Sequence, residues 1–193
     1  GASLLWVGWF GFNAGSAVVS DGRAGMAFAV THIATAVAAL AWMFTEWAVK
    51  GKPSVLGICS GAVAGLVAIT PASGFVSPAS SVIIGIAAGV VCFFTATSLK
   101  RAVGYDDSLD AFGVHCIGGI VGALLTGALV SKEISGATGS VLLQLRGVIA
   151  TLVWSFVMSL IILKVIDMTI GLRVGTDEER EGLDISQHGE SIE

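Results

Sequence analysis

The stretch SVLGICSGAVAGLVAITPA, residues 54–72, contains no charged residue and decides the class of fold. It is long enough to cross the hydrocarbon core of a bilayer as an α-helix, which takes about 20 residues. Its glycines Gly57, Gly61 and Gly65 recur every four residues, so they lie on one helix face where a second helix can approach closely. The stretch therefore predicts a closely packed transmembrane helix.

The rest of the chain repeats this pattern. Further apolar runs, each bounded by charged or turn-forming residues, occupy residues 3–20, 25–48, 80–99, 110–130 and 146–172. They do not alternate apolar and polar residues, as the strands of a membrane β-barrel would. We expect an all-α fold, a polytopic membrane helix bundle of about six transmembrane helices.

Composition supports a membrane protein. Hydrophobic residues make up 54% of the 193 residues and charged residues only 12%, whereas charged residues make up about a quarter of an ordinary soluble domain. The three cysteines lie singly in apolar runs, which favours neither a disulfide framework nor a zinc site. The sequence also lacks the common nucleotide-binding, metalloprotease and hydrolase motifs. We therefore expect no enzyme, no metal or cofactor and no nucleic-acid partner.

The charges divide the chain into two parts. Residues 173–193 hold two arginines and seven acidic residues, a net charge of -5, while residues 1–172 hold eight basic and seven acidic residues. We expect a transmembrane domain over 1–172 and an acidic tail over 173–193. With the tail in the cytoplasm, six basic residues lie in inner loops and three in outer ones, which satisfies the positive-inside rule. The tail is either solvated or held by ion pairs to Lys100 and Arg101.

Polar side chains inside apolar runs are costly in lipid, so each is a candidate for function. His115 lies several residues into the run 110–130, on the face that also carries Gly119, Gly122 and Thr126. Its imidazole either forms a hydrogen bond to a neighbouring helix or lines a pore, where it can exchange protons because imidazole titrates near neutral pH.

Asp110 stands at the head of the same run. We expect it to be structural, as an N-cap or as a negative charge that opposes the helix dipole. It would lie near the pore without taking part in a proton relay.

In the first run Trp9, Phe12 and Ser16 share one helix face. Aromatic faces can hold a partly desolvated cation, and a hydroxyl oxygen can accept one of its N–H groups. The alternative interpretation is an aromatic belt at the membrane interface. The sequence pattern alone favours the belt.

Several short segments are specific enough to suggest a family: WFGFNAGS (residues 9–16), GKPS (51–54), CSGAVAGLV (59–67), TPA (70–72), DAFGVHCIGG (110–119), GLRV (171–174), EREGLD (179–184) and HGE (188–190). In order and spacing they resemble the Amt/Mep/Rh family of ammonium transporters, on the Amt branch. The resemblance implies a homotrimer in which each subunit has its own pore. That pore is built from two inverted five-helix repeats and an eleventh helix.

By this resemblance the chain corresponds to the second repeat, the eleventh helix and the cytoplasmic tail. The first half of the fold would lie upstream of Gly1. Phe12 matches the aromatic gate of the outer pore, Ser16 the outer recruitment site for ammonium, and His115 the second of two pore histidines. An inverted-repeat transporter places its substrate path between the repeats, so this chain would carry one wall of the conduit.

The expected function is ammonium transport across a plasma or inner membrane. NH4+ would be recruited outside and deprotonated, and ammonia would cross an apolar, histidine-lined pore. The alternative is an ammonium sensor that reports occupancy to a signalling partner. Besides membrane lipid, the resemblance implies a PII-type signal protein as the partner of a regulatory tail formed by Glu179, Arg180, Glu181, Asp184 and His188.

Overall fold

The structure, a computed structural model, describes residues 1–191 and is built almost entirely of helices. The long ones are α2 (Gly22–Lys50), α3 (Val55–Ile69), α4 (Pro78–Phe94), α6 (Ile117–Leu129) and α8 (Val141–Thr169). With the short segments that extend them, they give five helices long and apolar enough to cross a membrane. No strand forms among these residues, apart from an isolated bridge between Val76 and Val130. The predicted all-α membrane bundle is confirmed.

The first helix, α1 (Ala2–Gly15), is shorter than the apolar run that predicted it. It has 14 residues and ends at Ser16. Val18, two residues further on, has a φ of 57° in the left-handed region, which a helix does not adopt. The expected helix over 3–20 therefore stops about five residues early.

Side-chain caps explain where the next helices begin. The Asp21 carboxylate accepts hydrogen bonds from the backbone N–H groups of Arg23 and Ala24, both at 3.0 Å, at the start of α2. The Ser54 hydroxyl accepts from Gly57 N–H at 2.9 Å at the start of α3. Such caps satisfy N–H groups that have no partner within the helix.

Short segments extend or link these helices. A 3-10 turn, η1 (Thr70–Ala72), ends α3, and a π-helical segment, η2 (Thr95–Leu99), continues α4 into α5 (Lys100–Val103). A second π-helical segment, η3 (Phe112–Cys116), leads into α6. A short helix, α7 (Lys132–Ser135), precedes α8.

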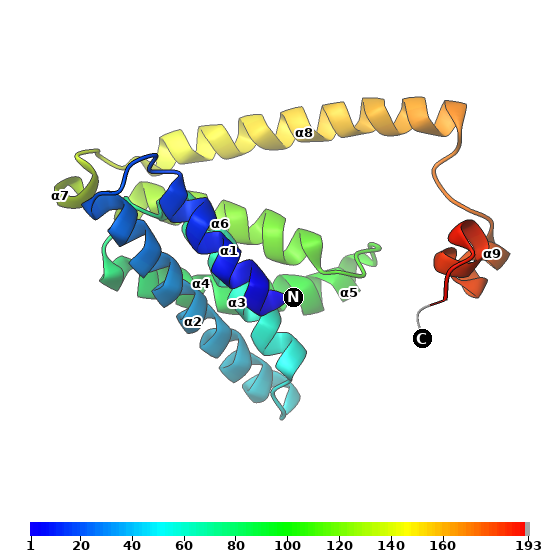
Figure 1. Cartoon of the computed structure of the whole chain (residues 1–193), viewed down its shortest axis with the longest axis horizontal. Coiled ribbons are helices and arrows are strands. Elements are labelled where there is room, and N and C mark those ends of the chain that lie inside the picture. The colour runs from blue at the N-terminus through cyan, green and yellow to red at the C-terminus, as the bar shows by residue number, and fades with distance from the viewer. Residues whose placement is uncertain (192–193) are drawn as a thin grey trace. The chain divides into compact units, whose positions relative to one another are not determined.

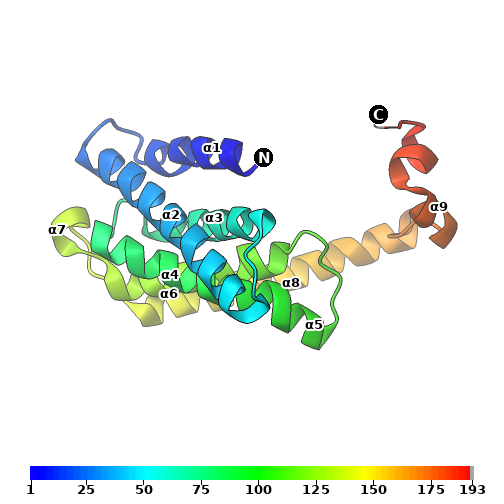
Figure 2. The ribbon, with the colours of Figure 1, turned by 90° about the horizontal axis from the view of Figure 1, so that it is seen from below.

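Helix α2 packs along α1, α3 and α4, as the two ribbon views agree (Figures 1 and 2). Glycines allow this contact. A Cβ added at Gly65 of α3 would lie 2.7 Å from the Ala34 carbonyl oxygen, and one at Gly89 of α4 would lie 2.6 Å from that of Ala38. The predicted glycine face of residues 57–65 is thus a helix contact. Gly11 and Gly15 of α1 face open space in this chain.

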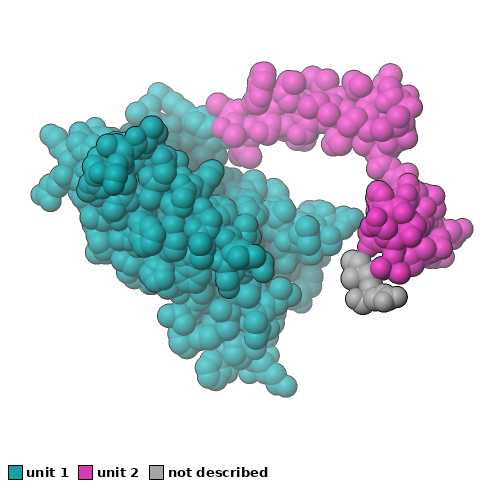
Figure 3. All heavy atoms as spheres, viewed as in Figure 1, with its two compact units in different colours: residues 1–148 teal, residues 149–193 magenta. Residues whose placement is uncertain are grey.

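The chain consists of two compact units, residues 1–148 and 149–193 (Figure 3). The first holds the packed helices. The second contains most of α8, none of whose residues is buried, followed by α9 (Thr176–Glu181) and η4 (Asp184–His188). The boundary falls within α8 and not at residue 172, so the division into a transmembrane domain and a tail stays a prediction.

The described part of the tail is locally ordered by its own ion pair. The Arg173 guanidinium donates to the Glu179 carboxylate, with Nη2 and Oε1 2.5 Å apart. This contact lowers the pKa of Glu179 below its usual value. Within the packed unit Lys100 pairs with Asp110 at 2.7 Å. The pairing of tail acids with Lys100 and Arg101 stays a prediction.

The glycine contacts predict that adding one methyl group at Gly65 destabilises the bundle. Gly65→Ala would place a Cβ 2.7 Å from both the Ala34 oxygen and the Ala38 Cβ, and overpacking of this kind costs about 1–3 kcal/mol. Thermal unfolding in detergent measures the loss. Gly25→Ala, on α2 with no atom within 4 Å, is the matched control and should unfold like the unaltered chain. Equal stability of both variants would contradict the packing.

Candidate functional site

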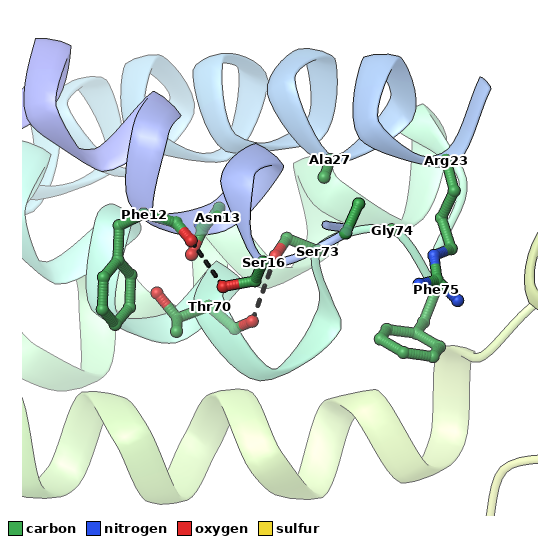
Figure 4. Close-up of a pocket in the computed structure, with 10 residues that line it drawn as sticks. Phe12, Asn13, Ser16, Arg23, Ala27, Thr70, Ser73, Gly74 and Phe75 are labelled. Atoms are coloured by element: carbon green, nitrogen blue, oxygen red, sulfur yellow. Dashed lines mark hydrogen bonds between the residues drawn. The ribbon is translucent and has the colours of Figure 1, made fainter. Parts of the chain in front are cut away.

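A cavity of about 290 Å³ lies where the end of α1 meets η1 and the start of α2 (Figure 4). It is lined by residues from all three segments and from the loop after η1: Phe12, Asn13, Ser16, Ala17, Arg23, Ala27, Thr70, Ser73, Gly74 and Phe75. The lining contains three hydroxyl side chains, one side-chain amide and one arginine. We call it the polar cavity.

Two side-chain hydrogen bonds fix α1 beside this cavity. Trp9 Nε1 donates to Thr70 Oγ1 at 2.8 Å, which ties α1 to the end of α3. Asn13 Nδ2 donates to Thr31 Oγ1 at 2.9 Å, and both residues are buried. A buried amide without a partner would cost stability, so these bonds set the position of α1 against its neighbours.

The three residues predicted from the first run do lie together. The Trp9 and Phe12 rings meet edge to face, with centroids 5.8 Å apart. Ser16 Oγ donates to the Phe12 carbonyl oxygen at 2.6 Å. Because this bond uses the hydroxyl proton, the lone pairs of Ser16 Oγ remain to accept a hydrogen bond from a ligand.

An apolar cavity adjoins the polar one and shares Phe12 with it. Its volume is about 600 Å³, and it is lined by Gly1, Leu4, Leu5, Gly8, Trp9 and Phe12, all from α1 and its N-cap. Leu4 is 78% exposed, Leu5 50% and Phe12 61%. We call this surface the apolar wall. It is a face of large hydrophobic side chains that the described chain leaves uncovered.

His115 lies in a third cavity that shares Gly1 and Leu5 with the apolar wall. This histidine cavity has a volume of about 220 Å³ and is also lined by Cys59, Ser60 and Val63 of α3. His115 is exposed and belongs to η3. π-Helical turns frequently occur at functional sites, where they redirect a side chain.

The three cavities follow one another through shared residues. Phe12 joins the polar cavity to the apolar wall, and Leu5 joins the apolar wall to the histidine cavity. A hydroxyl-lined entrance, an apolar stretch and an imidazole thus occur in sequence along α1. Such an arrangement can bind a small hydrogen-bond donor at one end and pass an uncharged molecule toward the other.

Asp110 does not cap the helix that carries His115. The Asp107 carboxylate accepts from the N–H groups of Ala111 and Phe112, both at 2.9 Å, and so holds that role. Asp110 accepts instead from Lys100 Nζ at 2.7 Å, and its φ of 54° lies in the left-handed region. Of the two structural roles expected for Asp110, a side chain that caps the helix is wrong, because the Asp107 carboxylate takes the free amides. The role as a negative charge that opposes the helix dipole stays a prediction.

Sequence reasoning missed Asn13, Thr31 and Thr70. A buried amide in an otherwise apolar run was the available signal for Asn13. Its partner lies 18 residues away and that of Trp9 lies 61 away, so the pairings required the fold. The tail residues Arg180 and Glu181 lie in α9, and Asp184 and His188 in η4, and none of them lines a cavity described above. The described residues contain no cluster of His, Cys, Asp or Glu fit for a metal ion.

Fold and site together define a polytopic helical membrane protein with an uncovered, partly apolar path on one face. The sequence profile of the Ammonium Transporter Family matches residues 1–192, and the chain belongs to that family.

Comparisons with individual relatives agree with this family assignment. The ammonium transporter of Aquifex aeolicus is 51% identical over 98% of this chain and 46% of its own length. The ammonium transporter Amt1 of Archaeoglobus fulgidus is 45% identical, over 98% of this chain and 50% of its own. The crystal structure of Saccharomyces cerevisiae Mep2 superposes with a TM-score of 0.86 at 34% identity, over 91% of this chain and 43% of that one. The chain spans about half the length of the relatives it matches.

The geometry predicts that Asn13 is more important for stability than Ser16, although both line the polar cavity. Asn13→Ala removes a buried bond between two helices, which should cost about 1–2 kcal/mol. Ser16→Ala removes only a bond within α1 and should change stability by less than about 0.5 kcal/mol. Chemical unfolding in detergent measures both. A larger loss for Ser16→Ala would contradict the assignment.

Proposed function

We propose that this chain forms one wall of an ammonium conduit. The observation that carries the proposal is the succession of polar cavity, apolar wall and histidine cavity along α1, in a chain that belongs to the Ammonium Transporter Family. The proposed direction, from Ser16 toward His115, rests on the distribution of basic residues, which puts the Ser16 end of the first apolar run on the outer side of the membrane.

Ammonium would first meet Ser16 and the aromatic rings. Its N–H groups need acceptors, and Ser16 Oγ has lone pairs to offer. The faces of Trp9 and Phe12 would attract its charge, at about 0.5–2 kcal/mol each. The Trp9–Thr70 and Asn13–Thr31 bonds keep these groups in place.

Beyond Phe12 the path becomes apolar, which would provide selectivity. A bare cation on the apolar wall loses hydration that leucine side chains cannot replace. Ammonium can avoid this cost by giving up a proton to solvent water at the polar cavity and crossing as NH3, whereas K+ and Na+ have no proton to lose. His115 would then offer a nitrogen lone pair or an N–H group to the neutral molecule beyond the apolar wall.

The other half of the conduit would cover the apolar wall. The chain matches only about half the length of its relatives, and Leu4, Leu5 and Phe12 are exposed in it. We include in the proposal a homotrimer in a plasma or inner membrane, with the tail in the cytoplasm and open to a PII-type partner. The distribution of basic residues supports the cytoplasmic side of the tail, and the trimer and the PII-type partner rest on the resemblance to the family.

A sensor is the second candidate, because a protein described as a Sensor Amt Protein superposes with a TM-score of 0.89 at 30% identity over 96% of this chain and 47% of that one. A sensor would bind ammonium at the polar cavity and couple occupancy to a partner. It would show saturable binding with little flux, which separates it from a transporter in the assays below.

His115 should line the conduit. In the complete protein, His115→Ala is expected to lower methylammonium uptake at least about tenfold or to admit K+, because the imidazole nitrogens are the hydrogen-bonding groups that His115 offers to a passing molecule in the histidine cavity. Uptake of labelled methylammonium into liposomes measures the first effect. Currents recorded with K+ in place of ammonium measure the second. His32→Ala, a histidine outside all three cavities, is the control. Normal uptake with normal ion selectivity in His115→Ala would refute the role.

Ser16 should govern recruitment. Ser16→Ala removes the acceptor oxygen at the polar cavity and is expected to raise the half-saturating ammonium concentration about 3- to 10-fold, with a smaller change in maximal flux. A titration of transport currents separates the two parameters. Ser20→Ala, an exposed serine that lines none of the cavities, should behave like the unaltered protein. An unchanged half-saturating concentration in Ser16→Ala would overturn the assignment.

The tail should regulate transport without building the fold. Deletion of residues 174–193 is expected to lower flux and abolish binding of a PII-type protein, while the trimer persists, because α9 and η4 bury no residue in the described chain. Size-exclusion chromatography, uptake and a binding titration measure the three properties. Full flux together with retained PII binding would contradict this role.

A further inference from the structure

One charged side chain, that of Arg23, lines the polar cavity and has no part in the recruitment proposed above. Of the ten residues that line this cavity within the described part of the chain, Arg23 alone is charged. Its guanidinium stays protonated at any physiological pH. A permanent positive charge therefore stands at the cavity where ammonium, itself a cation, would be recruited.

The loop after η1 holds the Arg23 side chain in place. Its stem passes Gly74, where an added Cβ would lie 3.2 Å from Arg23 Cγ. Its guanidinium lies over the Phe75 ring, with Cζ 6.0 Å from the ring centroid. Figure 4 shows the Arg23 and Phe75 side chains together on one side of the polar cavity and Phe12 on the other. The aromatic face thus keeps the charge at the cavity without neutralising it.

Arg23 forms no ion pair within residues 1–191. The nearest acidic residue in sequence, Asp21, directs its carboxylate to the backbone N–H groups of Arg23 and Ala24 and does not line the cavity. Electrostatic potentials add, so the contribution of Asp21 is the same whether Arg23 is present or replaced. Asp21 therefore does not cancel the change in potential that a replacement of Arg23 would cause.

We propose that Arg23 lowers the affinity of the polar cavity for ammonium by electrostatic repulsion, an inference that rests on the proposed function. Like charges repel across the cavity, and this repulsion raises the ammonium concentration that half fills the site at Ser16. Because Arg23 is exposed to solvent, salt screens the effect. Uncharged ammonia is not repelled, so the same charge favours release of the proton to water.

The test measures the half-saturating ammonium concentration of the complete protein, by transport currents in liposomes and by calorimetric titration in detergent. At low salt Arg23→Gln should lower this concentration about two- to fivefold, because the variant no longer repels the cation. Arg23→Lys keeps the charge and should resemble the unaltered protein. Arg146→Gln, at an exposed arginine of α8 that lines none of the three cavities, is the matched control.

Salt provides a second readout that a purely structural role would not move. In the unaltered protein the half-saturating concentration should fall as NaCl is raised, because a shorter Debye length screens the repulsion. Arg23→Gln should lose most of this dependence. A variant that only damaged the cavity would instead raise the half-saturating concentration at low and at high salt.

Each outcome decides the proposal. A lower half-saturating concentration in Arg23→Gln, with Arg23→Lys and Arg146→Gln unchanged, supports it. If Arg23→Gln matches or exceeds the unaltered protein in this concentration, or if Arg23→Lys lowers it as much as Arg23→Gln does, the proposal is wrong and the transport function stands. If the unaltered protein shows no saturable response to ammonium in either assay, the proposed function falls, and this inference falls with it.

Discussion

Helix α2 lies so close to α3 and α4 that no side chain fits between their backbones where they cross. The Ala34 carbonyl oxygen would meet a Cβ at Gly65 on one side and at Gly85 on the other, both at 2.7 Å. The Ala38 oxygen is approached in the same way by Gly61 and Gly89. Helices in lipid associate mainly through such close packing, since the lipid itself is apolar. The other elements of the packed unit are arranged around this triple contact.

The contact also determines where the functional residues can lie. Helix α3 ends at η1, whose Thr70 accepts the Trp9 indole N–H, and α2 presents Thr31 to Asn13. Helix α1 is therefore fixed by two polar bonds to elements that cannot shift without breaking the glycine contacts. In the same way Gly113 packs against the Ala96 backbone, at 2.8–2.9 Å from an added Cβ, which fixes η3 and with it His115.

The sequence alone predicted the class of fold, the approximate spans and the glycine contact face, because lipid permits few alternatives to apolar helices. The positions of Trp9, Phe12 and Ser16 on one face followed from helical periodicity. The hydrogen bonds Asn13–Thr31 and Trp9–Thr70 could not be predicted, since each joins two separate helical segments. The cap at Asp107 depends on a left-handed turn at Asp110, a backbone choice that the run of aspartates does not specify. The roles of Ser16, Phe12 and His115 in transport remain a proposal that rests on their shared path.

The central claim is that this chain supplies one wall of a conduit whose other wall covers Leu4, Leu5 and Phe12. Uptake of labelled methylammonium in cells that lack their own ammonium transporters tests it most directly. The chain would be expressed alone and together with the first half of a family member. The account predicts uptake only when both halves are present, with loss of that uptake when His115 is replaced by alanine. Uptake by the chain alone would contradict it.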